Sequence, residues 1–245
     1  HLTTRRQRQM CIRDRSLGCA INDFLDRDFD KNVERTKNRP IASKNLSLTE
    51  AGIFIVILAS ICVFLLMQTN PYTIKLVCCI AIPMIVVYPL MKRFLAMPQL
   101  FLGATFGLSL PISYSIAESS INLEVIFLYL GCIFWIIAYD TYYALCDIED
   151  DRKLNLNSSA IFFGNDTQKA IILFSLLFLG VVMLFALKNS SFLLGVGAVF
   201  LIYQIYFQNK LSNLNKNLDA FKANSHIGLI IAILIFIENQ NEFYS

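Results

Sequence analysis

The sequence predicts an all-α protein, a polytopic bundle of transmembrane helices. Of its 245 residues, 56% are hydrophobic and only 16% are charged, whereas charged residues make up about 25% of an ordinary soluble domain. The apolar residues come in blocks of roughly 17–25, which is long enough for a helix to cross a bilayer. The basic residues fall in short loops between these blocks, so nothing indicates a nucleic-acid partner.

The first residues differ from the rest. Residues 1–14, HLTTRRQRQMCIRD, are basic and contain no apolar core, so they form neither a signal peptide nor a span. We expect them to be a non-native or disordered peptide, with a genuine basic cytosolic arm as the alternative. Residues 15–245 are expected to form the membrane domain. Within it, residues 16–21 resemble the last turns of a membrane helix.

About seven complete spans follow. Glycine and proline inside several of them are tolerated in membrane helices, and small residues also allow close helix approach. The seven cysteines lie mostly inside apolar runs and are interpreted as reduced filler. The expected spans cover residues 48–68, 72–91, 98–117, 122–147, 168–187, 191–208 and 221–238.

Lysine and arginine predict the orientation of these spans. One set of alternating loops is rich in both, and the other set holds only Lys75 and Lys188. The basic set is cytosolic by the positive-inside rule. The basic loops contain Arg27, Lys31, Arg35, Lys37, Arg39, Lys44, Lys92, Arg93, Arg152, Lys153, Lys169, Lys210, Lys216 and Lys222.

An acidic stretch, NDFLDRDFD, lies just before the first complete span. On a helix, Asn22, Asp23, Asp26 and Asp30 fall within an arc of about 100°. Carboxylates crowded on one face repel each other, so a cation is expected among them. Mg²⁺ prefers such oxygen ligands and usually combines one or two carboxylates with substrate phosphates.

A second acidic stretch ends the span 122–147. Asp140, Tyr143, Asp147, Asp150 and Asp151 share one helical face, with Asp140 about 10 Å deeper in the membrane than Asp147. Ionisable residues inside spans are expensive, which makes them functional candidates.

Three complete spans separate the two acidic stretches, so both arrive at the cytosolic side. Together they can hold two Mg²⁺ ions, and two Mg²⁺ ions ringed by lysine and arginine suit a diphosphate. The alternative is a pair of solvated acidic helix ends. That interpretation gives no reason for both stretches to lie on the same side of the membrane. It also places acids at helix C-termini, where they oppose the helix dipole.

These residues resemble the UbiA superfamily of intramembrane prenyltransferases. NDFLDRDFD matches the family's first motif, N-D-x-x-D-x-x-x-D, and Asp147–Asp151 matches its second, D-x-x-x-D. Tyr88–Lys92 matches its Y-x-x-x-K element. The resemblance runs from about residue 15 to the C-terminus. It also includes the segments RTKNRPIAS, PQLFLGATFG, AYDTYYALCDIEDDRK and SSAIFFG.

The resemblance implies nine helices around a central cavity, of which this sequence would hold seven complete spans and the end of the second helix. It implies Mg²⁺-dependent transfer of a polyprenyl group from a polyprenyl diphosphate to the ring of 4-hydroxybenzoate, a step in ubiquinone biosynthesis. It implies contact with the surrounding membrane lipid and no obligate protein partner.

The resemblance also implies a role for each site residue. One ion would be held by Asn22, Asp26 and Asp30, with Asp23 beside it, and the other by Asp147 and Asp151. The carboxylates Asp26, Asp30, Asp147, Asp151 and Asp140 form the expected catalytic set. Substrate contacts are expected from Lys92, Arg93, Tyr88, Tyr143, Lys153 and Arg39.

Several alternatives remain open at this point. Arg93 suits the benzoate carboxylate because of its fork of donors, but it is equally well explained as a positive-inside arginine. Trp135, Tyr139, Tyr142 and Tyr143 suit an allylic cation through cation–π attraction, or they are packing residues. Other acceptors are dihydroxynaphthoate, homogentisate or haem. Outside this enzyme class, the acids could form the relay of an ion or proton transporter.

Overall fold

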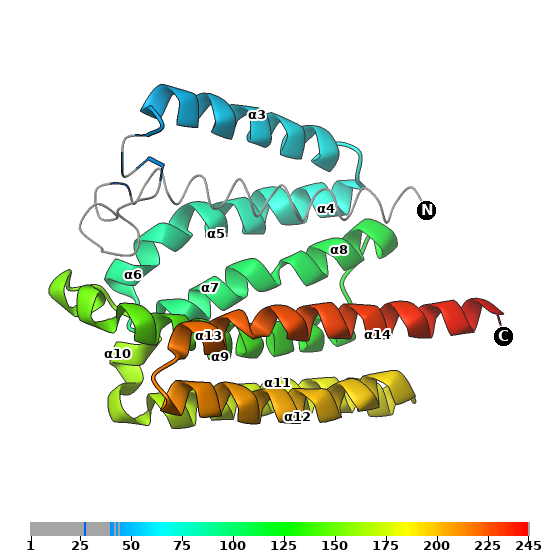
Figure 1. The fold of residues 1–245 in the computed structure, drawn as a ribbon. Coiled ribbons are helices and arrows are strands. Elements are labelled where there is room, and N and C mark those ends of the chain that lie inside the picture. Colours follow the sequence, from blue (N-terminus) through cyan, green and yellow to red (C-terminus); the bar gives the residue numbers. More distant parts are fainter. Residues whose placement is uncertain (1–26, 28–39, 42, 44, 245) are drawn as a thin grey trace. The chain divides into compact units, whose positions relative to one another are not determined.

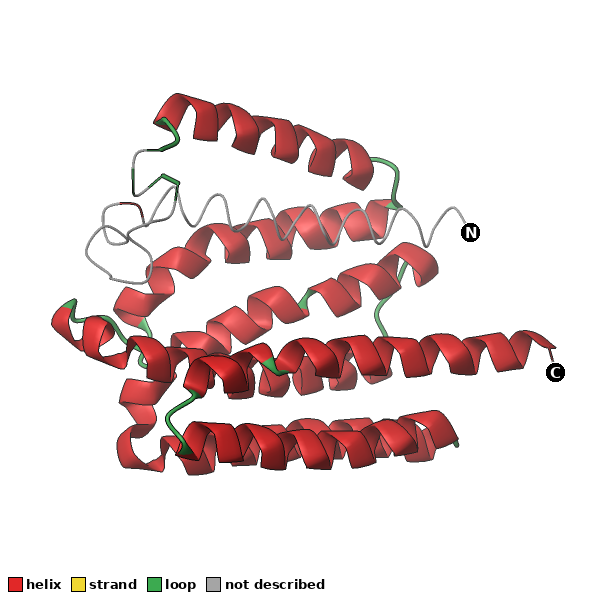
Figure 2. Ribbon diagram, viewed as in Figure 1, coloured by secondary structure: helices red, strands yellow, loops and turns green. Residues whose placement is uncertain are grey.

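The protein is described here from a computed structural model, which describes residue 27, residues 40, 41 and 43, and residues 45–244 (Figure 1). Within these ranges every regular element is a helix, as predicted, and no strand occurs (Figure 2). The predicted peptide 1–14 lies outside the described residues. The first acidic stretch does too, apart from Arg27. The chain divides into two compact units, unit 1 (His1–Leu90 and Leu108–Asn122) and unit 2 (Met91–Gly107 and Leu123–Ser245).

The seven predicted spans are confirmed within the described part of the chain as helices long and apolar enough to cross a membrane. Four ends differ from the prediction by four residues or more. The fourth helix continues past Asp147 to Lys153 and the sixth continues to Asn213, whereas the fifth span begins already at Ser159 and the last at Asn217. The seven are Leu48–Leu66, Pro71–Phe94, Pro98–Glu118, Leu123–Lys153, Ser159–Lys188, Phe192–Asn213 and Asn217–Glu238.

Unit 1 opens with helix α3 (Leu48–Leu66), which begins at a capping box. The Ser47 hydroxyl accepts a hydrogen bond from the Glu50 N–H at 3.2 Å, and the Glu50 carboxylate accepts one from the Ser47 N–H at 2.9 Å. Two of the orphan donors at the helix start are thereby satisfied, which explains why the span begins here.

The second span changes its winding at its prolines. A proline lacks the N–H and its ring clashes with the carbonyl four residues earlier, so a π turn lies just before Pro83 and a 3₁₀ turn surrounds Pro89. The sequence of elements is α4 (Pro71–Leu76), a π turn (Val77–Ala81), α5 (Ile82–Val87) and a 3₁₀ turn (Tyr88–Leu90).

The third span is broken at Leu108 into α7 (Pro98–Gly107), in unit 2, and α8 (Ser109–Glu118), in unit 1. Within unit 1, α8 packs on α4 through polar side chains. The hydroxyls of Thr73 and Ser115 lie 2.9 Å apart, and the Asn70 amide donates to the Ser115 carbonyl at 2.7 Å. Thr73 and Ser115 are fully buried, so their hydroxyls are satisfied inside the protein.

Unit 2 is arranged around α9 (Leu123–Lys153), the helix that carries the second acidic stretch. It contacts α7, α10, α11 and α13, while α12 packs against α11 and α14. The remaining elements of the unit are α6 (Met91–Phe94), α10 (Ser159–Phe163), a 3₁₀ turn (Gly164–Asp166), α11 (Thr167–Lys188), α12 (Phe192–Asn213), α13 (Asn217–Lys222) and α14 (Asn224–Tyr244).

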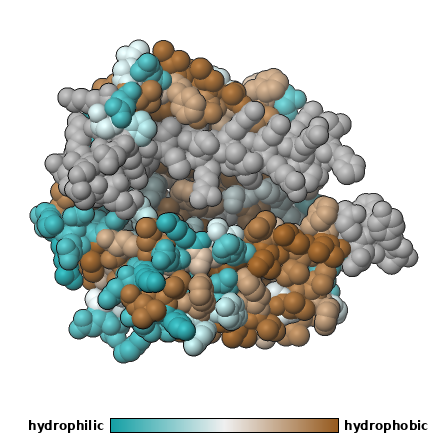
Figure 3. All heavy atoms as spheres, in the orientation of Figure 1, coloured by the Kyte–Doolittle hydropathy of each residue, from teal (hydrophilic) through white to brown (hydrophobic). Residues whose placement is uncertain are grey.

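Apolar side chains fill the interior of unit 2 in two clusters. One is centred on Leu201 and Ile227 and includes residues of α11, α12 and α14. The other joins Tyr142, Ile171 and Ala220 of α9, α11 and α13. The outer faces of the same helices carry exposed leucine, isoleucine and phenylalanine, as lipid-facing helices do. In Figure 3 the polar residues of unit 2 gather at the end where α12 meets α13.

Glycines allow α9 to approach its neighbours closely, as the sequence predicts for small residues in these spans. A Cβ on Gly103 of α7 would lie 3.1 Å from the Ile133 carbonyl of α9. On the other side of α9, a Cβ on Gly131 would lie only 2.7 Å from a methyl group of Val181. Backbone contact of this kind is characteristic of helix packing in membranes.

Gly131→Ala is therefore expected to destabilise the protein. The added methyl group would collide with Val181, whose β-branched side chain has one strongly preferred rotamer in a helix. Overpacking of this kind costs about 1–3 kcal/mol. Thermal unfolding of the detergent-solubilised protein measures the effect. Gly180→Ala is the matched control, because a Cβ there meets nothing within 4 Å. Equal stability of the two variants would contradict the close approach of α9 to α11 at Gly131.

Candidate functional site

Three carboxylates lie together on one face of α9. Asp140, Asp147 and Asp151 are close enough for the charge of each to act on the others. Asp151 is buried, with 6% of its surface exposed, and Asp140 and Asp147 are partly buried. The helical period predicts this shared face. Three carboxylates in such a place repel one another unless a cation lies among them.

Lys92 supplies a positive charge to this face. It lies on the short helix α6, and its charge acts on both Asp140 and Asp151. Its backbone carbonyl accepts a hydrogen bond from the Asn157 N–H at 2.9 Å, which ties α6 to the loop that follows α9. We call Lys92, Asp140, Asp147 and Asp151 the acid–lysine cluster. It contains more negative than positive charge.

Two buried side chains that sequence reasoning missed support the cluster. The Gln99 side chain of α7 lies close enough to the Asp140 carboxylate to act on it as a hydrogen-bond donor, and its carbonyl oxygen accepts the Ser159 N–H at 2.8 Å. The Ser158 hydroxyl is similarly close to the Asp151 carboxylate and caps the start of α10. Gln99 is 4% exposed and Ser158 is 1% exposed. The sequence feature that could have identified Gln99 is its place directly after Pro98 in an apolar span, because a buried polar side chain requires a hydrogen-bond partner.

The other predicted substrate residues that the structure describes have different environments. Arg93 follows Lys92 on α6 and is exposed. The Tyr143 ring packs on Phe221 with 4.9 Å between centroids. Lys153 is 72% exposed and pairs with Asp150 at 3.5 Å. Tyr88 belongs to unit 1, where it begins a 3₁₀ turn. Asn22, Asp23, Asp26, Asp30 and Arg39 lie outside the described residues.

The aromatic residues of α9 have different environments. Tyr142 is 2% exposed in an apolar cluster, so its role is packing. The Trp135 ring stacks on Phe178 with 5.4 Å between centroids, and its indole N–H donates to Asn224 at 3.2 Å. Tyr139 contacts Trp135 edge to face. The structure thus favours the packing interpretation for Tyr142 and Trp135.

The donor set suits a hard cation that also binds a ligand. Asp147 and Asp151 lie one helical turn apart on the same face. Among the described residues, no group of three acids, histidines or cysteines is placed to hold a metal ion by itself. Mg²⁺ commonly takes only one or two carboxylates and completes its octahedron with phosphate oxygens and water. The two carboxylates fit that pattern, with further ligands coming from elsewhere.

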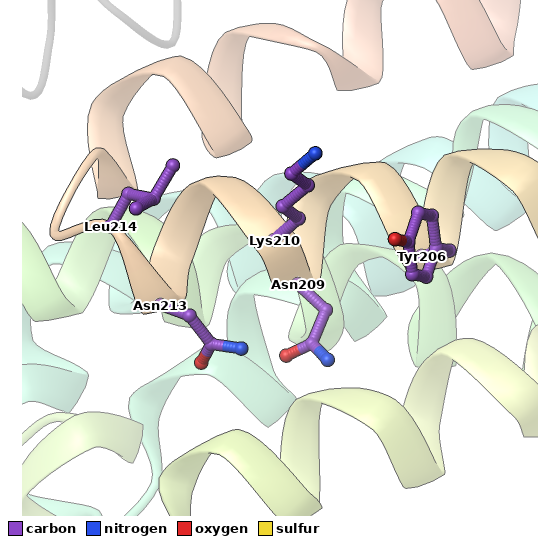
Figure 4. A pocket seen from close by; sticks show the side chains of 5 residues that line it. All are labelled: Tyr206, Asn209, Lys210, Asn213 and Leu214. Carbon is purple, nitrogen blue, oxygen red and sulfur yellow. The ribbon is translucent and has the colours of Figure 1, made fainter.

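A hollow of about 270 Å³ lies on α12, away from these residues. Figure 4 shows its lining side chains diverging, with those of Lys210 and Leu214 on one side of the helix and those of Asn209 and Asn213 on the other. Diverging polar groups do not converge on one ligand, and no carboxylate lines the hollow. The acid–lysine cluster therefore remains the candidate site.

The chain is similar to known proteins over most of its length. The sequence pattern of the UbiA prenyltransferase family matches residues 14–232. A 4-hydroxybenzoate octaprenyltransferase of Francisella tularensis subsp. novicida is 42% identical over 91% of this chain and 80% of its own length. One from Polynucleobacter necessarius is 43% identical over 86% of this chain and 74% of its own length.

Solved structures give the same fold. The apo structure of a UbiA homologue from Aeropyrum pernix superposes with a TM-score of 0.84 at 22% identity, covering 95% of this chain and 90% of that one. A UbiA homologue from Archaeoglobus fulgidus bound to GPP and Mg²⁺ gives a TM-score of 0.70 at 18% identity, covering 95% and 87%. The chain is a multi-pass integral membrane enzyme that belongs to the UbiA prenyltransferase family.

Proposed function

We propose that this chain transfers a polyprenyl group from a polyprenyl diphosphate to the ring carbon beside the hydroxyl of 4-hydroxybenzoate. The observation that carries the proposal is the acid–lysine cluster, in which Lys92 acts on Asp140 and Asp151 beside Asp147. The names of the relatives that are 41–43% identical support the acceptor and the tail. GPP and Mg²⁺ in the Archaeoglobus homologue support the donor class.

The cluster is suited to a diphosphate rather than to a neutral substrate. Lys92 can donate to phosphate oxygens directly, as a compact positive charge. Asp147 and Asp151 would hold one Mg²⁺, and Asn22, Asp26 and Asp30 of the first motif would hold another, with Asp23 beside it. When bound, Mg²⁺ neutralises the diphosphate charge as a Lewis acid and makes it a better leaving group.

The chemical step needs a dry and ordered site. The bond between the allylic carbon and the diphosphate oxygen breaks, and the electron pair leaves with the diphosphate. The ring carbon of the acceptor then bonds to the allylic carbon, and the ring loses its proton. Water would capture the allylic cation, so its exclusion matters. Tyr143 is half-buried and packs on Phe221, and we propose that its π face lies along this path.

The site is proposed to open to the cytosol at a bacterial inner membrane. The basis is the positive-inside rule applied to the basic loops that flank both acidic motifs. Arg39 in the first loop and Lys153 at the end of α9 are proposed to add positive charge for the diphosphate. The proposed catalytic domain is residues 15–245.

An acceptor panel tests the function. Membranes carrying the protein are incubated with Mg²⁺, a polyprenyl diphosphate and one of 4-hydroxybenzoate, dihydroxynaphthoate, homogentisate or haem. Prenylated 4-hydroxybenzoate and released diphosphate are expected. Transfer to another acceptor would replace the proposed one. Ion or proton movement without diphosphate release would instead favour a transporter.

Asp147→Ala is expected to abolish transfer while leaving the protein in the membrane. Removing one group that stabilises the charge developing in a transition state costs about 10²–10³-fold in turnover. Glu149→Ala is the matched control, because Glu149 lies at the same helix end but is exposed and outside the acidic face. The same loss is expected for Asp26→Ala. Turnover of Asp147→Ala near the wild-type rate at saturating Mg²⁺ would refute the metal assignment.

Arg93→Ala distinguishes three roles for this exposed residue. If the guanidinium binds the acceptor carboxylate, the acceptor KM should rise about 10–150-fold, the cost of a charge-assisted hydrogen bond. Arg93→Lys should restore only part of the lost acceptor affinity, since an ammonium cannot form the bidentate fork. An effect on the donor KM alone would place Arg93 at the diphosphate. If both KM values stay unchanged and the protein inserts less efficiently into the membrane, Arg93 acts only as a topology signal.

A further inference from the structure

Gln99 is the one side chain of α7 that touches the acid–lysine cluster in the described contacts, and it does so from inside the bundle. Its side chain lies close enough to the Asp140 carboxylate to act on it as a hydrogen-bond donor. Its carbonyl oxygen accepts the Ser159 N–H at 2.8 Å. One buried amide thereby connects α9, which carries the three acids of the cluster, with the start of α10.

The start of α10 is joined to the cluster in three further ways. The Ser159 hydroxyl lies 2.8 Å from the hydroxyl of Thr141, the neighbour of Asp140. The Ser158 hydroxyl lies close enough to the Asp151 carboxylate to act on it as a donor, and the Asn157 N–H donates to the Lys92 carbonyl. Of three consecutive residues in this segment, two therefore reach members of the cluster, and the third contacts Thr141 beside Asp140. A shift of Ser159 would be transmitted to Asp151 and Lys92 through its two neighbours.

We infer that Gln99 is a positioning residue of the proposed diphosphate site, fixing Asp140 directly and Asp151 and Lys92 through residues 157–159. This inference rests on the proposed function. Outer partners of this kind orient the groups that bind a metal or an anion, and their loss commonly costs about 10–100-fold in affinity or activity. An apolar residue of similar volume would fill the same space but fix none of these groups.

The test compares two buried glutamines. Gln99→Met keeps approximately the volume and removes both hydrogen bonds. Gln208→Met is the control, because Gln208 is 3% exposed in the same unit and its amide donates to a backbone carbonyl, that of Ala220, at 3.3 Å. Four quantities are measured: the thermal unfolding midpoint, its rise with MgCl₂ plus inorganic diphosphate, kcat, and the Mg²⁺ concentration that gives the half-maximal rate.

A positioning role predicts a separation between the two variants. Gln99→Met should lose about 10–100-fold in kcat and in apparent Mg²⁺ affinity, and most of the stabilisation by magnesium and diphosphate. Gln208→Met should lose stability but keep all three ligand-dependent quantities. Ligand-induced stabilisation reports binding without turnover, so it decides the inference even if the acceptor assignment is wrong.

Two results would overturn the inference. One is a Gln99→Met protein that unfolds earlier but binds magnesium diphosphate and turns over like the control. The other is failure of both Gln99→Met and the smaller Gln99→Ala to fold while Gln208→Met folds, which would make the contact structural. A wild-type protein that binds magnesium diphosphate but prenylates no tested acceptor would count against the proposed function, not against Gln99.

Discussion

The charge of Lys92 beside Asp140 and Asp151 is the interaction on which the polar end of unit 2 depends. Charged groups within a membrane helix are costly unless they are paired or functional. Here α6 brings the ammonium, α9 brings the carboxylates, and α7 and the start of α10 bring neutral donors. The cluster holds three carboxylates and one ammonium, so its net charge attracts a cation, and its lysine can contact an anion bound to that cation.

The bilayer imposes a second constraint, which governs where the helices are irregular. Backbone groups surrounded by lipid must be satisfied within the protein, so helix breaks require local substitutes. Pro83 and Pro89 are accommodated by a π turn and a 3₁₀ turn. The break at Leu108 coincides with a boundary between the two units. In the second and third spans, the helix is thus irregular at its prolines and at the boundary between the units.

The features that sequence reasoning predicted are those governed by local periodicity. The apolar blocks predict the seven spans, and the 3.6-residue period places Asp140, Asp147 and Asp151 on one face. Gln99 could not be assigned, because its partners lie on α9 and at the start of α10, far along the chain. The role of Ser158 depends on how the loop after α9 turns back toward Asp151, which no local pattern predicts. The packing role of Tyr142 likewise depends on Ile171 and Ala220, which no local pattern places beside it.

The environment of Trp135 gives this protein a built-in optical reporter. It is the single tryptophan of the chain, and its indole is stacked on Phe178 of α11 and hydrogen-bonded to Asn224 at the start of α14. Its emission therefore arises from one known junction of three helices. Because indole emission shifts with polarity and hydrogen bonding, movement of α14 against α9 would change the spectrum without any added label.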